Sequence, residues 1–121
     1  MKSFEQLVAA FVEGVQKTQD VDYENRASVR RNNRGVEQYR LAVKEIDLLY
    51  LERIDELAEL LNDSRPKIRL CCAVCLVELT RCSEEIYQRA VSVVEKYALT
   101  ADAVDKRGFY IWLDEHKKPS P

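Results

Sequence analysis

Three cysteines stand close together in the chain, at Cys71, Cys72 and Cys75. Thiolates at such short spacing could bind a metal ion or form a redox pair. Structural zinc usually takes two separated Cys/His pairs, however, and the only histidine, His116, stands far along the chain. On a helix the cysteines fall among leucine, isoleucine and valine, where a free cysteine packs as a small hydrophobe. We therefore predict that they are core residues and that no metal or cofactor is bound.

Four carboxylates share one face of the helix expected over residues 48–61. They are Glu52, Asp55, Glu56 and Glu59. Acid–base catalysis by paired carboxylates needs groups that face each other across a cleft, which one exposed helix face does not supply. Two alternatives are open for this acidic face, a solvated surface or a strip that binds a partner.

Arginines form a stripe on the preceding helix, where Arg26, Arg30 and Arg34 recur every four residues with Arg31 beside them. Like charges at this spacing cost about 0.2–0.5 kcal/mol per pair, so a compensating acid is expected. We favour pairing within the chain, to the acidic face of residues 48–61. An acidic partner protein and a nucleic acid are the alternatives. The nucleic acid is disfavoured because the pI is near 5.5 and no aromatic residues interleave with the arginines.

Other signatures of catalysis are missing from the sequence. No P-loop, G-x-S-x-G, G-x-G-x-x-G or H-E-x-x-H pattern occurs. A single histidine leaves little for acid–base chemistry near neutral pH. Trp112 is a possible binding anchor, but we expect it to close a helical core near the C-terminus. The prediction is that the protein is not an enzyme.

The composition predicts one all-α domain. A chain of 121 residues can bury a single core unaided, and only three glycines and three prolines interrupt it, which favours helices joined by short turns. No apolar run approaches the roughly 20 residues that cross a bilayer. Glu5 and Glu13 interrupt the apolar N-terminal stretch, unlike a signal peptide. We expect a cytoplasmic protein that does not contact a membrane.

Charge is unevenly distributed along this nearly neutral chain. Residues 26–44 hold six basic side chains against one acid, and residues 45–63 hold seven acids against one arginine. Adjacent blocks of opposite sign predict a strongly dipolar molecule.

Helical periodicity places about six helices. Ser3 should cap the first, a second should span 22–46 with a possible break near Gly35, and a third should span 48–61. Ser64 and Pro66 should begin a fourth over 65–81, apolar nearly all round and therefore central. Ser83 should open the fifth. The sixth should begin at Thr100, and its packing side should carry Val104, Gly108, Ile111 and Trp112, with Gly108 allowing another helix to approach closely.

The segment LLNDSRPKIRLCCAVCLVEL, residues 60–79, resembles a HEAT-type helical repeat. The likeness covers the leucines, the turn at Asp63, Pro66 and the Ile68-Arg69 pair. Cys71 and Cys72 stand where such repeats usually have alanine. The resemblance implies that Asp63 and Arg69 tie neighbouring repeats together.

A long helix rich in Asn and Arg, ENRASVRRNNRGVEQYRLAVKEI, follows a short amphipathic helix, and the chain ends near GFYIWLDEHK. In these features about residues 3–117 resemble a small bacterial family of single-domain HEAT-like proteins whose activity is not established. That resemblance implies a fold and a continuous second helix, and it carries no catalytic residue across to this chain. We expect a HEAT-like or ARM-like hairpin at the centre of a small right-handed α–α superhelix or bundle, with domain bounds 1–118 and a disordered tail 119–121.

For function, we predict a non-enzymatic module that binds another protein, as monomer or homodimer. In its finer form it is a bacterial immunity or antitoxin-type protein that masks a toxin domain. A nucleic-acid-binding accessory protein that uses the arginine stripe is the alternative.

Overall fold

The computed structural model describes residues 1–117. This part of the chain contains six α-helices and two short 3₁₀ turns, joined by loops. The helices are α1 (Phe4–Gln16), α2 (Arg26–Leu49), α3 (Ile54–Ala58), α4 (Pro66–Leu79), α5 (Glu84–Thr100) and α6 (Ala103–His116). The turns η1 (Leu51–Arg53) and η2 (Glu59–Asn62) flank α3. No strand occurs in this range, so the all-α prediction is confirmed. The tail predicted at 119–121 lies outside the described residues.

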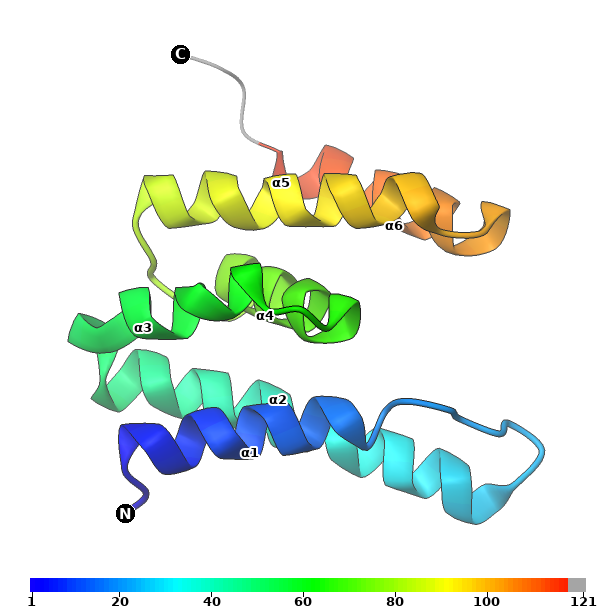
Figure 1. The fold of residues 1–121 in the computed structure, drawn as a ribbon, viewed down its shortest axis with the longest axis horizontal. Helices are drawn as coiled ribbons and strands as arrows, with labels where there is room; N and C mark the ends of the chain where they lie inside the picture. The colour runs from blue at the N-terminus through cyan, green and yellow to red at the C-terminus, as the bar shows by residue number, and fades with distance from the viewer. Residues whose placement is uncertain (118–121) are drawn as a thin grey trace.

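The helices pair into three stacked tiers, α1 with α2, α3 with α4, and α5 with α6 (Figure 1). The α3–α4 pair is the middle tier, where a central hairpin was expected. α4 contacts both α2 and α5, and it is buried on both sides, as its apolar circumference predicts. Glu78 on α4 also joins the tiers: its carboxylate accepts from Arg40 of α2 at 3.1 Å and from the indole N–H of Trp112 of α6 at 2.7 Å.

α1 and α2 cross at two glycines, Gly14 and Gly35, and α2 runs through Gly35 without a break. A Cβ at Gly35 would lie 2.5 Å from the carbonyl oxygen of Gly14, so the two backbones meet where neither residue has a side chain. The break that the sequence allowed near Gly35 therefore does not occur. The close approach expected at Gly108 is wrong too, because a Cβ there would meet nothing within 4 Å.

Two of the expected N-caps are confirmed. The Ser3 hydroxyl accepts from the Gln6 amide, and the Gln6 side chain accepts from the Ser3 amide in return. Ser83 accepts from the Ile86 amide at the start of α5. Both caps are local patterns, and each forms where the pattern places it.

Two other expected caps are wrong. Arg65, not Ser64, occupies the N-cap position of α4 and makes no side-chain cap bond. Asp102, not Thr100, caps α6 through the Asp105 amide, because the Thr100 hydroxyl donates backward to the Tyr97 carbonyl. Thr100 is thus the last residue of α5.

The helix expected over 48–61 is wrong in its bounds. α2 continues to Leu49, and Tyr50 then leaves helical geometry with φ −137° and ψ 36°. The Tyr50 ring packs edge-on against Phe4 with centroids 6.1 Å apart, and its hydroxyl donates to the Lys2 carbonyl. These contacts with the N-terminus hold the chain in a turn, and the following residues form η1, α3 and η2.

α6 packs on a different face from the one expected. Leu113 is its buried residue, and Phe109 and Trp112 are half-buried against the core, whereas Val104 and Ile111 are 82% and 53% exposed. The Phe109 ring lies edge-on to Tyr97 of α5 with centroids 5.4 Å apart. α6 packs at the end of the stack, so only one row of its side chains faces the core.

Candidate functional site

The three cysteines of α4 lie in the core, as predicted. Cys71, Cys72 and Cys75 are at most 6% exposed. Burial raises the pKa of the Cys75 thiol to about 12 and raises the pKa values of Cys71 and Cys72 as well. Thiols with such pKa values stay protonated near neutral pH and are poor nucleophiles. Among residues 1–117, no three His, Cys, Asp or Glu side chains are placed to hold a metal ion.

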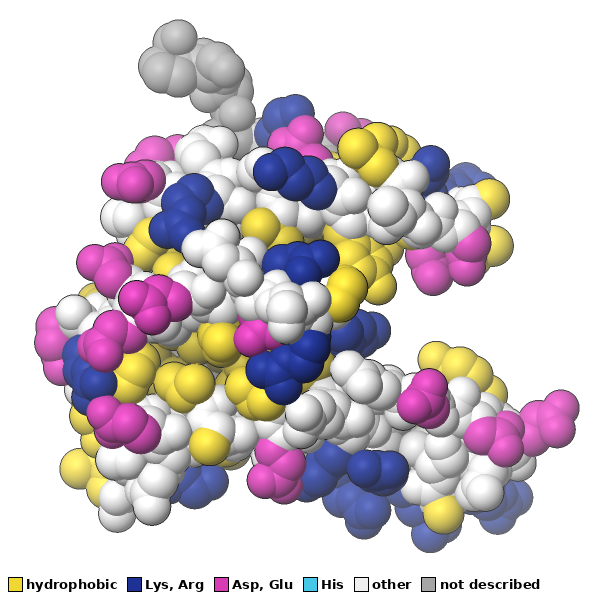
Figure 2. Space-filling model, in the orientation of Figure 1, with side chains coloured by type: hydrophobic (Ala, Val, Ile, Leu, Met, Phe, Trp, Pro, Cys, Tyr) yellow, Lys and Arg dark blue, Asp and Glu magenta, His cyan; other side chains and the backbone are white. Residues whose placement is uncertain are grey.

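The arginine stripe makes none of the predicted ion pairs. Arg26, Arg30, Arg31 and Arg34 are exposed, and none of them pairs with an acid in residues 1–117. Figure 2 shows basic side chains along the N-terminal half of α2 and acidic side chains over α3, at opposite ends of the molecule. Pairing of the stripe with the acids of residues 48–61 of the same chain is therefore wrong, because the fold separates them.

Only one of the four acids on residues 51–62 has a partner among the described residues. Arg53 bonds Glu56 at 2.6 Å and Glu5 of α1 at 2.8 Å, and it lies over the Phe4 ring at 4.1 Å. These bonds lower the pKa values of both carboxyls. The other acids are exposed and form no ion pair with residues 1–117; they are Glu52, Asp55 and Glu59.

Asp63 and Arg69 lie at the turn into α4, but their contacts stay within that turn. The Asp63 carboxylate accepts from both the amide and the guanidinium of Arg65, and these bonds lower its pKa to about 2. Arg69 donates to the Asp63 carbonyl at 2.7 Å. A tie from Asp63 to a neighbouring helix pair, which the HEAT resemblance implies, is not formed.

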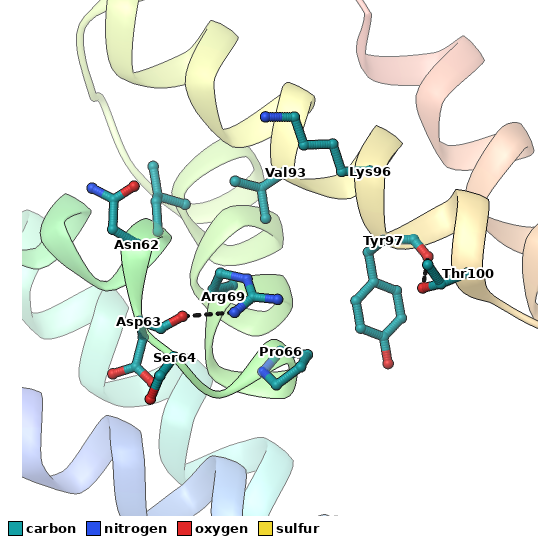
Figure 3. Close-up of a pocket in the computed structure, with 10 residues that line it drawn as sticks. Asn62, Asp63, Ser64, Pro66, Arg69, Val93, Lys96, Tyr97 and Thr100 are labelled. Atoms are coloured by element: carbon teal, nitrogen blue, oxygen red, sulfur yellow. Dashed lines mark hydrogen bonds between the residues drawn. The ribbon is translucent and has the colours of Figure 1, made fainter.

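A cleft of about 600 Å³ opens between this turn and α5 (Figure 3). Figure 3 shows the Arg69 guanidinium in the middle of the cleft, with the Tyr97 ring projecting from α5 at one side. Lys96 lies on the α5 rim. Because Arg65 neutralises Asp63, the charge facing this cleft is positive.

A second cleft of about 390 Å³ lies between α4 and α6. Its lining is mainly apolar and comes from Val74 of α4 with Val104, Phe109 and Trp112 of α6, beside Asp105 and Gly108. Tyr97 lines the first cleft and Phe109 the second, and their rings are in contact, so the two hollows share a wall. We call them together the paired cleft.

Sequence reasoning missed the paired cleft. The sequence predicted that Trp112 packs against the core, but it did not predict a hollow beside it. In the structure the Trp112 indole stacks on His116, with ring centroids 4.3 Å apart. No single residue carried a signal for the paired cleft in the sequence, because Val104 was expected on the packing side of its helix and is 82% exposed in the structure.

Comparison with known proteins adds no assignment. No protein-family model matches the chain, and neither the curated proteins nor the solved structures gave a significant match. In residues 1–117, no helix combines the length and apolar character that a membrane crossing requires. The geometry of the described surfaces is therefore the basis for a functional argument.

Proposed function

We propose that the protein is a non-enzymatic protein-binding module that holds a segment of its partner in the paired cleft. The observation that carries the proposal is the contact between Tyr97 and Phe109, which sets a basic hollow beside an apolar one. Anchors in protein interfaces fill such pockets, and stacked helix pairs commonly present them.

The lining of the paired cleft indicates the chemistry of the partner segment. Arg69 and Lys96 suit an acidic side chain, since a guanidinium with unused N–H groups binds carboxylates well. Val74 and Phe109 suit an apolar side chain a few residues away. A segment that carries both kinds of residue fits both hollows at once.

Two substitutions on the rim of the paired cleft, one that reverses a charge and one that introduces a charge, test the proposal. Lys96→Glu and Val104→Asp change exposed side chains, so the fold should survive while the partner is lost. The measurement is affinity capture from the source cell with tagged wild-type and variant proteins, followed by mass spectrometry after nuclease treatment.

Matched controls lie on α6. Arg107→Glu and Ile111→Asp alter exposed residues that line neither cleft. These controls should retain the partner that the rim variants lose. Recovery of the same partner by all four variants would refute binding in the paired cleft.

In its finer form, the proposal makes the partner a toxin domain that the protein masks. Three exposed acids, Glu52, Asp55 and Glu59, have no ion pair with residues 1–117 and are suited to the basic surface of a nuclease. Identification of the captured partner decides this form: a toxic nuclease would support it, and an unrelated enzyme or scaffold protein would oppose it.

A second candidate is nucleic-acid binding, which the unpaired arginine stripe favours. Replacing Arg26, Arg30 and Arg34 with alanine should then weaken binding to duplex DNA or RNA. It should also reduce the slope of log affinity against log salt concentration by about three. A salt slope that is unchanged in the triple variant would remove this candidate.

A further inference from the structure

The exposed face of α2 carries arginines along its N-terminal half and two exposed leucines further along. These residues fall within about 80° of arc, opposite the buried face of the helix. They are Arg26, Arg30, Arg34, Leu41 and Leu48, and we call them the α2 stripe; the exposed Glu37 and Lys44 lie in the same arc. Leu41 is 57% and Leu48 is 74% exposed, and the two leucines lie two helical turns apart on one face of α2.

Two sets of uncompensated charge lie at the two ends of this stripe. The arginines occupy the N-terminal half of α2, and none is paired with residues 1–117. Glu52, Asp55 and Glu59 follow the C-terminal end of α2 and are equally unpaired within that range. The exposed leucines separate the two charge sets along the chain.

Antiparallel contact between two α2 helices would bring these sets together. A two-fold axis near Leu41 sets the basic half of each α2 toward the C-terminal end of the other, where the acids of residues 52–59 begin. Arg30 and Glu52 stand equally far from Leu41 along the chain, so this axis sets Arg30 of each copy near the point where the chain of the other copy leaves α2. In a parallel arrangement the arginines would face arginines instead.

We propose that a second copy of this chain docks on the α2 stripe, antiparallel to it, with the arginines of each copy facing the acids of the other. The complement to the arginines is present on the same molecule, as unpaired acids just beyond the C-terminal end of α2. A self-complementary patch of this kind is what a two-fold dimer requires. This inference does not depend on the paired cleft, which lies on other helices.

Sedimentation equilibrium of the full chain tests the dimer. Wild-type protein should dimerise, and dissociation should increase with salt because the contacts are partly ionic. Leu41→Asp should give monomers, while the matched control Ile111→Asp, at a residue of similar exposure on α6, should leave the dimer intact. Monomeric wild type, or dimers that survive Leu41→Asp, would overturn the proposal.

A charge exchange makes the test specific to the proposed pairing. One variant carries Arg26→Glu, Arg30→Glu and Arg34→Glu, and the other carries Glu52→Lys, Asp55→Lys and Glu59→Lys. Each alone should be monomeric, because like charges would face each other at both contacts. Mixed, they should form a 1:1 heterodimer, since both contacts become attractive. If both variants are folded by circular dichroism and no heterodimer forms on mixing, the antiparallel arrangement is contradicted. If wild-type protein captures nucleic acid and the arginine variant does not, the arginines belong to the nucleic-acid candidate instead.

Discussion

At the scale of single residues, the glycine crossing of α1 and α2 leaves no room for a side chain. A Cβ at Gly14 would come within 2.8 Å of both the Gly35 carbonyl oxygen and the Tyr39 amide nitrogen, and backbone atoms cannot move aside cheaply. We expect Gly14→Ala and Gly35→Ala each to lower the free energy of unfolding by about 1–3 kcal/mol through overpacking. Urea denaturation followed by circular dichroism measures this.

Gly108→Ala is the matched control for the glycine crossing. Gly108 lies within α6 and its Cβ would meet nothing within 4 Å, so alanine should raise the free energy of unfolding by about 0.5–1 kcal/mol. Destabilisation by Gly108→Ala as large as that at Gly35 would show that the crossing is not the special position.

Asp63 makes stability depend on acid pH. Its folded pKa of about 2 lies below the unfolded value of about 3.9, so the carboxylate stabilises the fold at neutral pH. This contribution should fade as the pH falls from about 4 toward 2. Asp63→Asn should therefore be less stable than wild type at pH 7, with the difference shrinking at low pH. A difference that stays constant between these pH values would contradict the assignment.

Thiol reactivity should report the burial of the cysteines. In the folded protein, only the half-buried Cys82 should react quickly with an aromatic disulfide reagent, while the three cysteines of α4 should react after unfolding. The number of thiols titrated with and without denaturant measures this. Rapid reaction of a second thiol in the folded state would mean that α4 is not the centre of the stack.

At the scale of elements, the arginines at the start of α2 and Arg53 of η1 should respond differently to mutation. Alanine at Arg26, Arg30 and Arg34 should leave thermal stability unchanged or slightly raised, because it removes like-charge repulsion and no contact within the described chain. Arg53→Ala should lower the melting temperature, since Arg53 joins α1 to the start of α3. If the triple variant melted lower than Arg53→Ala, the arginines would have structural partners after all.

Elements whose signals are local could be predicted from the sequence. Ser3 and Ser83 cap their helices because each cap needs only the next three residues. The apolar circumference of α4 indicated its central place. The burial of the cysteines could be predicted as well, since most of their neighbours on that helix are aliphatic.

Features that depend on distant residues could not be predicted. The turn at Tyr50 depends on contacts with Lys2 and Phe4, which are far away in the sequence. The face on which α6 packs depends on Tyr97 of α5. The paired cleft is built from three helices and a turn, so no segment by itself carries its signature.

At the scale of the whole molecule, three tiers divide the surface into separate regions. The paired cleft lies between the middle and last tiers (Figure 1). The α2 stripe lies on the exposed face of α2 in the first tier, and the acids follow the end of α2. A dimer through α2 therefore leaves the cleft open for a different protein. It covers the acids that the toxin-masking form of the proposal uses, so that form requires the monomer. Self-association and partner binding should be separable by mutation.

Hydrogen–deuterium exchange of the protein alone and with its captured partner tests the central claim most directly. We predict that the partner slows amide exchange in residues 61–69, 93–100 and 104–112, which line the paired cleft. Protection confined to residues 26–34 or 51–62, with the cleft segments exchanging as in the free protein, would contradict the claim that the paired cleft is the binding site.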